Sequence, residues 1–195
     1  MRINGAAIQH DREGLLIHTD QSYFNCPQYI QSRDIQKGVI QESAPSLVHP
    51  FETLTLAQQA WIIQADTFFI ASLHPESGAD ASHRGGYPGF VRVVNAKTLI
   101  FPDYSGNNMF NTLGNLLVNP NAGLLLIDFE QGRTLQLTGK TQLICEDERL
   151  THFAGAERLI EFQIERGVET ANATSLRWKF REYSPANPLD SNVMG

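Results

Sequence analysis

The sequence predicts a mainly β fold, a small antiparallel β-barrel with peripheral helices. Two observations support this prediction. After residue 50 the chain holds five or six short segments with alternating or continuous apolar residues, both of which are typical of strands. Helical periodicity is confined to short stretches, one of which lies between the third and fourth strand. This order favours a barrel whose ends are covered by helices.

The expected helices are short. The first begins near Thr55, because Thr55 and Gln58 have the spacing of a capping box. The second covers 109–118, where apolar residues recur on one helical face until Asn119-Pro120 ends the pattern. A third helix is expected over roughly 147–157.

The expected strands alternate with clear turn signals. Pro75–Gly78 follows the first strand, and Asn95–Lys97 joins the second and third strands in a hairpin. The strands are expected at residues 67–73, 89–94, 98–101, 122–129, 134–144 and 160–165.

Residues 1–50 differ from the rest of the chain. They contain one apolar run, Leu15–Ile17, one compact segment, Tyr23–Ile30, and a polar stretch with two prolines. This is too little apolar surface for a core of its own. We therefore expect an N-terminal arm with a short strand at 1–50 and a single barrel domain at 51–195.

Composition excludes several function classes. The chain has 195 residues, of which 15 are Lys or Arg and 21 are Asp or Glu, so its formal net charge is −6. This charge argues against non-specific binding to nucleic acid or anionic lipid. The sequence has no apolar stretch of transmembrane length, no signal-peptide core and only two distant cysteines, Cys26 and Cys145. We expect a cytoplasmic protein that binds neither nucleic acid nor membrane.

Metal binding and nucleophilic catalysis have no support in the sequence. The six histidines lack HxxxH or HxH spacing, so we expect surface histidines and no metal site. Cys26 precedes Pro27 and has no signature that pairs it with a histidine, which favours a structural cysteine.

An anion site is indicated at residues 104–108, where the sequence Tyr-Ser-Gly-Asn-Asn leads from a strand into the second helix. Backbone N–H groups at a helix N-terminus attract anions, and Gly106 allows close approach of the backbone. An asparagine-rich cap without any ligand would give the same pattern.

A second candidate is the span Ser82–Arg92, which contains three glycines and one proline. Such residues are costly inside a strand unless something lies close against the backbone. Arg84 and Arg92 flank the glycines, and guanidinium groups bind phosphate. A bulged barrel strand with two solvated arginines is the alternative.

Together these two segments resemble the pyridoxamine-phosphate-oxidase-related, FMN-binding split-barrel family, within it the uncharacterised flavin-nucleotide-binding members. The resemblance covers about residues 54–165 and rests on RGG, PGFVRV, FPDY, GN, NP and GR in this order. Residues 25–30, NCPQYI, resemble the NCPxYI signature of such proteins. The resemblance implies a homodimer with FMN at the subunit interface.

The resemblance also assigns cofactor-binding residues. It implies that Tyr87 to Arg92 lie along the isoalloxazine, that Pro102-Asp103 lie under the ribityl chain, and that the turn at Gly106 binds phosphate. It further implies that Arg133 and Thr134 reach the flavin of the partner subunit. The expected cofactor-binding residues are Arg84, Tyr87, Phe90, Val91, Arg92, Pro102, Asp103, Gly106, Asn107, Asn108, Arg133 and Thr134.

Two departures from the family pattern are informative. Asn107 and Asn108 stand where the family has a basic pair, so the phosphate would need Arg84 or Arg92 together with the helix N-terminus. The oxidase's Arg-x-His segment has no match, which argues against pyridoxamine phosphate as substrate. The expected function is an FMN-binding oxidoreductase with a small-molecule substrate that the sequence does not name. The alternatives are a non-catalytic flavin or tetrapyrrole binder, acting as carrier or sensor, and a dimeric interaction module with a vestigial flavin site.

Overall fold

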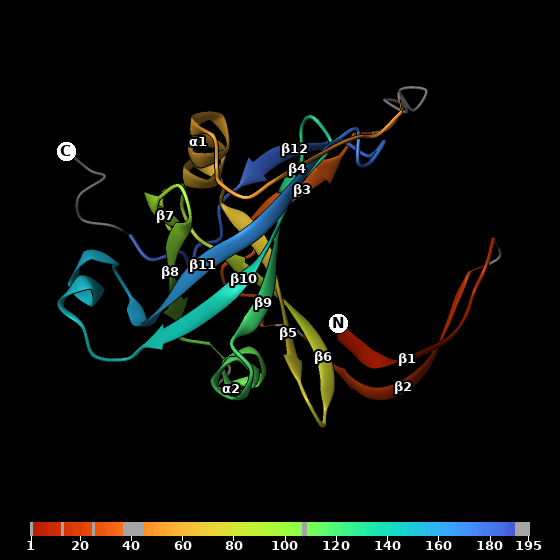
Figure 1. The fold of residues 1–195 in the computed structure, drawn as a ribbon, viewed down its shortest axis with the longest axis horizontal. Helices are drawn as coiled ribbons and strands as arrows, with labels where there is room; N and C mark the ends of the chain where they lie inside the picture. Colours follow the sequence, from red (N-terminus) through yellow and green to blue (C-terminus); the bar gives the residue numbers. More distant parts are fainter. Residues whose placement is uncertain (1, 13, 25, 37–44, 107–108, 190–195) are drawn as a thin grey trace.

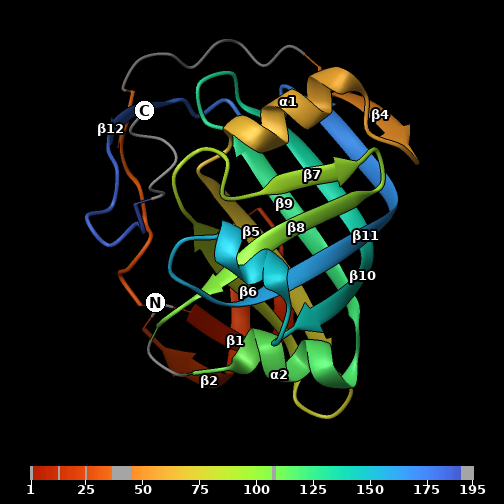
Figure 2. The same cartoon turned by 90° about the vertical axis from the view of Figure 1, so that its left-hand side faces the viewer.

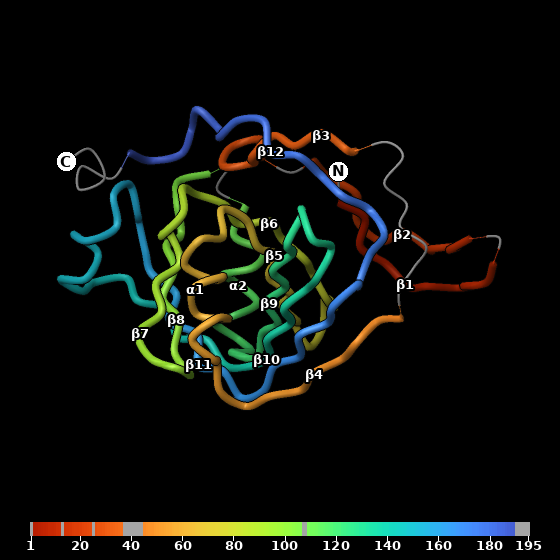
Figure 3. The backbone as a smooth tube through the Cα atoms, turned by 90° about the horizontal axis from the view of Figure 1, so that it is seen from above, coloured from red at the N-terminus to blue at the C-terminus, as the bar shows by residue number. Residues whose placement is uncertain are grey.

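The computed structural model describes residues 2–12, 14–24, 26–36, 45–106 and 109–189 (Figure 1). Its centre is one antiparallel sheet of eight strands, in the order β6-β5-β9-β10-β11-β8-β7, with β4 paired to β11. Seen from above, the strands curve around a common core (Figure 3). The strands are β4 (Leu47–Phe51), β5 (Thr67–His74), β6 (Gly78–Gly85), β7 (Arg92–Asn95), β8 (Thr98–Tyr104), β9 (Asn121–Asp128), β10 (Arg133–Ile144) and β11 (Ala156–Ala171).

The sheet is not closed. In the described part of the chain its end strands, β6 and β7, do not pair with each other. The fold is therefore mainly β and antiparallel, with a split between the two edges, as the sequence predicted. The long strand β11 connects β8 and β4 to the rest of the sheet. Its first half pairs with β8 and its second half with β4, along the same edge.

Two α-helices cover opposite ends of the barrel (Figure 2). The helix α1 (Leu56–Gln64) has the predicted capping box, in which Thr55 Oγ1 accepts from the Gln58 N–H and the Gln58 side chain accepts from the Thr55 N–H. The helix α2 (Asn111–Val118) begins two residues later than expected and has no side-chain cap.

The prediction of a third helix at 147–157 was wrong. Residues 148–152 form only a 3-10 turn, η1 (Glu148–His152), and β11 already begins at Ala156. Asp147 caps η1 by accepting from the Arg149 N–H, and the Arg149 guanidinium also pairs with this carboxylate. The expected strand at 89–94 is also shorter than predicted, because residues 86–91 form a loop before β7.

The core lies inside the curved sheet. Most of its largest fully buried side chains come from β5, β8, β10 and β11, largely at alternate positions, with Ile62 added from α1 and Leu126 from β9. They include Phe68, Phe101, Leu135, Leu137, Phe162 and Ile164.

The N-terminal region carries more strand than the single short one expected. A hairpin of β1 (Arg2–His10) and β2 (Leu15–Tyr23) extends away from the barrel (Figure 1). Next, β3 (Ser32–Ile35) pairs with β12 (Trp178–Glu182) in a separate two-stranded sheet. These pairings bring the N-terminal and C-terminal segments together on one side of the barrel (Figure 3).

None of the helices in the described ranges has the length and hydropathy needed to cross a bilayer. Within the same ranges, no three His, Cys, Asp or Glu side chains are grouped closely enough to hold a metal ion.

Candidate functional site

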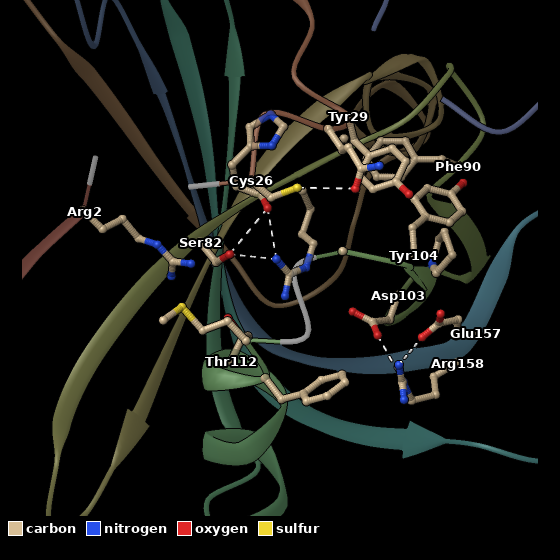
Figure 4. A pocket seen from close by; sticks show the side chains of 18 residues that line it. Arg2, Cys26, Tyr29, Ser82, Phe90, Asp103, Tyr104, Thr112, Glu157 and Arg158 are labelled. Carbon is tan, nitrogen blue, oxygen red and sulfur yellow. Dashed lines mark hydrogen bonds and ion pairs between the residues drawn. The ribbon is translucent and has the colours of Figure 1, made fainter. Parts of the chain in front are cut away.

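A polar cavity of about 120 Å³ lies in the split of the barrel, between β6 and the second half of β8 (Figure 4). The split provides the space, because β7 pairs only with the first half of β8, and β6 is the other end strand of the described sheet. Three arginines line the cavity: Arg2 from β1, Arg84 from β6 and Arg158 from β11. Its further lining includes Cys26, Tyr29, Ser82, His83, Phe90, Pro102, Asp103, Tyr104, Gly106 and Glu157.

Arg84 has an unsatisfied donor in this cavity. Its Nη1 donates to Ser82 Oγ at 2.7 Å and to the His83 carbonyl oxygen at 3.0 Å, but its buried Nε has no hydrogen-bond partner. Burial is the main cause that lowers the pKa of Arg84. Arginine stays charged in proteins, so a positive charge with a free donor is held in a desolvated wall. Such a group favours an anionic ligand.

The other two arginines are held by carboxylates. Arg158 Nε donates to Asp103 at 3.1 Å, and its guanidinium also pairs with Glu157. The Asp103 carboxylate thus orients Arg158 at the wall. Arg2 Nη1 donates to Asp80 at 2.7 Å. Among the described residues, no carboxylate forms an ion pair with Arg84.

The segment 26–31 closes one side of the cavity. The Tyr29 backbone is in the left-handed region, with φ of 64°, and the Tyr29 hydroxyl donates to the Ser105 carbonyl oxygen at 2.7 Å. The Tyr29 ring lies against Tyr104, with centroids 5.0 Å apart. Burial is the main cause that raises the pKa of Tyr29, so its hydroxyl remains a donor.

The buried side chain of Gln31 attaches this segment to the barrel through hydrogen bonds. Its Nε2 donates to the carbonyl oxygens of Asp66 and Gly86, at 3.3 and 3.2 Å. Its Oε1 accepts from the Ser184 N–H at 2.8 Å and from Asn187 Nδ2 at 3.1 Å. One side chain therefore joins the N-terminal segment, the loop after β6 and the C-terminal segment.

His83 contributes a neutral imidazole to the wall. Burial, and next the positive charge of Arg84, lower the pKa of His83 to about 4. Its ring packs edge-on against Phe69, with centroids 5.7 Å apart. At neutral pH the imidazole is uncharged, so it adds hydrogen-bonding capacity and no charge.

A second cavity, about 490 Å³ and mostly apolar, adjoins the first; both are lined by Phe90 and Tyr104. Its aromatic walls come from the loop after β6, from the residue after η1 and from the C-terminal segment. They include Tyr87, Phe153 and Tyr183, and the Tyr87 and Tyr183 rings contact edge to face at 4.9 Å. The Arg92 guanidinium lies 4.1 Å from the Phe153 ring centroid and donates to the His152 carbonyl oxygen. The small polar cavity and the larger aromatic cavity therefore share a wall made by Phe90 and Tyr104.

The sequence profile of the pyridoxamine 5'-phosphate oxidase family matches residues 54–183, about two thirds of the 195 residues. The chain belongs to the pyridoxamine 5'-phosphate oxidase family. The matched range contains both edges of the split and every described barrel strand from β5 to β11, together with most of both cavity walls.

The solved structures that the chain resembles are distant in sequence. HupZ of Group A Streptococcus is 11% identical with a TM-score of 0.47, and the match covers 58% of this chain and 92% of that one. A structure described as a putative pyridoxamine 5'-phosphate oxidase from Lactobacillus delbrueckii is 12% identical with a TM-score of 0.47, with 60% and 98% covered. An FMN-binding protein from Syntrophomonas wolfei is 11% identical with a TM-score of 0.43, with 58% and 84% covered. No curated protein matches the chain.

Within this pyridoxamine 5'-phosphate oxidase fold, the expected cofactor residues fall into separate groups. Five line the polar cavity: Arg84, Phe90, Pro102, Asp103 and Gly106. Tyr87, Arg92 and again Phe90 line the aromatic cavity. Val91 is a core residue, 2% exposed. Asn107 and Asn108 lie outside the described residues.

Arg133 and Thr134 line neither cavity. Both begin β10, and the Arg133 guanidinium lies over the Trp61 ring, 4.3 Å from its centroid, and pairs with Asp128 at 2.9 Å. Thr134 Oγ1 is buried and has no hydrogen-bond partner.

The sequence motifs did not identify several residues that line the two cavities. Arg2, Arg158 and Tyr29 line the polar cavity, and Phe153 and Tyr183 line the aromatic one. Only Tyr29 carried a signal, because it belongs to the NCPQYI segment. The others belong to none of the quoted motifs, and the folded chain brings them to the cavities.

The walls fit a ligand with an anionic group and a flat ring system. Arg84 Nε, a buried side-chain donor without a hydrogen-bond partner, belongs to the wall of the polar cavity. The Arg84 donor suits a phosphate oxygen, and the aromatic chamber has the volume and lining of a small-molecule site.

Proposed function

We propose that this protein is an FMN-binding flavoprotein, and that it acts as an oxidoreductase on a small molecule. The observation that carries the proposal is Arg84: a charged, desolvated guanidinium with a free Nε in a polar cavity that adjoins an aromatic one. This combination suits a phosphate joined to a planar ring. Membership in the pyridoxamine 5'-phosphate oxidase family supports the same conclusion.

Each cavity would hold a different part of the cofactor. Arg84 and Ser82 would hold the phosphate, with the backbone at Gly106 nearby. Tyr87 and Tyr183 would contact the ring, and Arg92 would stabilise negative charge on it. A bound flavin supplies hydride and single-electron transfer, whereas the protein supplies position, electrostatics and exclusion of water.

We further propose a homodimer. Arg133 and Thr134 line neither cavity of their own chain, so the flavin contact that the family resemblance implies for them would be made to the flavin of a partner subunit. Exposed apolar side chains on α2, with Leu117 at 70% and Val118 at 59%, provide surface for such a contact. We place this dimer in the cytoplasm. Light scattering after size-exclusion chromatography should give twice the 21.8 kDa chain mass, and a monomer in the presence of FMN would contradict it.

The first experiment is an absorbance spectrum of the purified protein, with chromatography of any released chromophore. We expect a flavin spectrum and released FMN, or saturable uptake of added FMN. Arg84→Gln should weaken FMN binding at least tenfold, because Arg84 is the arginine of the described cavity lining that has no ion pair with a carboxylate. Arg166→Gln, at an exposed position on β11, is the matched control and should bind as the wild type does.

Reduction distinguishes the proposal from its alternatives. An oxidoreductase should have its bound flavin bleached by NADPH or NADH and restored by an acceptor. A flavin that neither nucleotide reduces would favour a non-catalytic binder, and uptake of a tetrapyrrole in place of flavin would favour that kind of carrier. A colourless protein that takes up neither would leave a dimeric interaction module.

A further inference from the structure

We propose that the N-terminal hairpin delivers a second cation, Arg2, to the anion subsite of the polar cavity. This inference rests on the proposed function, because it assigns the same phosphate a second partner. It concerns the hairpin β1–β2, which precedes the family-matched range and which no motif assigned to the site.

The hairpin touches the barrel through a small, specific contact. Asp80 on β6 accepts hydrogen bonds from Arg2 at 2.7 Å, from Asn4 at 3.2 Å and from the Tyr23 hydroxyl at 2.9 Å. The Asp80 side chain is only 5% exposed, and that of Arg2 only 18%. Tyr23 is held from the other side by Asn111 of α2, at 2.9 Å. Three hairpin side chains thus converge on one buried carboxylate.

Most of the other described residues of the hairpin are exposed to solvent. Beyond residue 5 of β1 the strand is exposed, as is most of β2, and the ribbon extends away from the barrel (Figure 1). An isolated two-stranded ribbon is marginally stable in water. The contact at Asp80 therefore determines where the hairpin sits, and it places the first described residue of the chain at the cavity wall. Figure 4 shows Arg2 extending toward Ser82, the same residue that accepts from Arg84.

The charges around the cavity show why a second cation matters. Arg158 pairs with two carboxylates, Asp103 and Glu157, whereas Arg2 pairs with one, Asp80, so Arg158 is the more fully neutralised of the two. Arg84 has no carboxylate partner among the described residues, but a phosphate monoester carries nearly two negative charges at neutral pH. Burial is the main cause that lowers the pKa of Arg84; the charge of Asp103 raises it, the charge of Arg2 lowers it further, and the charge of Asp80 raises it. Asp80 orients Arg2 toward the wall, as Asp103 orients Arg158.

The test compares Arg2→Gln with Arg12→Gln, which removes a cation from the exposed far end of the same hairpin. Dissociation constants are measured for FMN and for riboflavin, which has the same ring and no phosphate. We expect Arg2→Gln to weaken FMN binding about tenfold, the loss of one charge-assisted hydrogen bond, and to leave riboflavin unchanged. Arg12→Gln should change neither.

Two further measurements separate binding from attachment of the hairpin. Arg2→Gln leaves Asp80 as a buried charge, so the double variant Arg2→Gln/Asp80→Asn keeps a neutral hydrogen-bonded pair in its place. It should recover the melting temperature of the wild type but not the FMN affinity. Recovery of both would overturn the proposal and leave Arg2 as an anchor only.

The outcomes also separate this inference from the proposed function. If Arg84→Gln loses FMN but Arg2→Gln binds it as tightly as the wild type does, only the role of Arg2 is wrong. If the wild type does not bind FMN, inorganic phosphate is titrated by thermal shift. A phosphate-dependent rise in melting temperature that Arg2→Gln abolishes would support Arg2 without a flavin. Absence of that rise in the wild type would overturn both proposals.

Discussion

The carbonyl oxygen of Tyr29 lies so close over Gly85 that a β-carbon at residue 85 would overlap it. The same β-carbon would come within 2.9 Å of the His83 ring and 3.1 Å of Gln31 Nε2. This contact packs the NCPQYI segment directly against the Arg-Gly-Gly sequence. The glycine at the end of β6 lets the N-terminal segment cross the strand and close the polar cavity.

Gly85→Ala should displace segment 26–31 and destabilise the protein by about 1–3 kcal/mol, the usual cost of overpacking. FMN binding should weaken in the same variant, because Tyr29 leaves the cavity wall. Gly114→Ala is the matched control: its added β-carbon meets nothing within 4 Å, and a helical alanine should stabilise by about 0.5–1 kcal/mol. Urea denaturation measures both. Equal stability of the two variants would contradict the close contact.

The ion pair of Arg33 and Asp66 should hold β3 and β12 against the barrel. Arg33 Nη2 contacts both carboxylate oxygens, at 2.5 and 2.6 Å, and its guanidinium lies 4.2 Å from the Phe129 ring centroid. Arg33→Gln should cost about 3 kcal/mol, because it leaves a largely buried carboxylate without its cation. Adding Asp66→Asn should restore part of that loss. A double-mutant cycle in urea measures the coupling, and additive effects would show that the pair contributes nothing.

His83 should make the protein less stable in mild acid. Its pKa is about 4 in the folded chain, below the ordinary value of 6.5, so the unfolded chain takes up this proton first. The stabilisation is present above about pH 6.5 and is lost as the pH falls towards 4, with a slope of up to about 1.4 kcal/mol per pH unit.

Between these pH values, His83→Gln should therefore lose less stability than the wild type. His10→Gln, at an exposed position on the hairpin, should follow the wild-type curve. Free energies of unfolding at several pH values test this, and parallel curves for His83→Gln and the wild type would contradict the buried neutral imidazole.

Tyr183 should contribute to binding of the flavin ring and not to binding of the FMN phosphate. It lies in the aromatic cavity, 37% exposed, and contacts Tyr87 and Phe180. Tyr183→Ala should weaken FMN and riboflavin by the same factor, about fivefold to tenfold, because aromatic contacts contribute about 1 kcal/mol or more. Arg84→Gln should weaken FMN alone. Fluorescence titration with each flavin separates the two patterns, and a loss of FMN alone in Tyr183→Ala would place the ring elsewhere.

Local signals in the sequence predicted the barrel well. Thr55 and Gln58 form the expected cap, and the strand expected at 134–144 corresponds to β10. These features depend on residues near one another in the chain. The helix expected near residue 150 was wrong, because Asp147 caps only a 3-10 turn before β11 begins.

The site was harder to predict because its walls come from distant segments. Arg84 and Asp103 were named from motifs, and both line the polar cavity. Arg2 lies 78 residues from its partner Asp80, and β1 has no buried face that would mark it as a strand. Arg158 and Tyr183 likewise acquire their roles only through tertiary contacts. The roles of Arg133 and Thr134 stay predictions, since they depend on a second copy of the chain.

The most direct test of the account is the ratio of FMN to riboflavin affinity in the wild-type protein. The two ligands share the ring and differ in the phosphate, so the ratio measures what Arg84 and its cavity contribute. We predict that FMN binds at least about 100-fold more tightly, equivalent to about 2.7 kcal/mol, and that Arg84→Gln removes most of this difference. Equal affinities, or no binding of either flavin, would contradict the account.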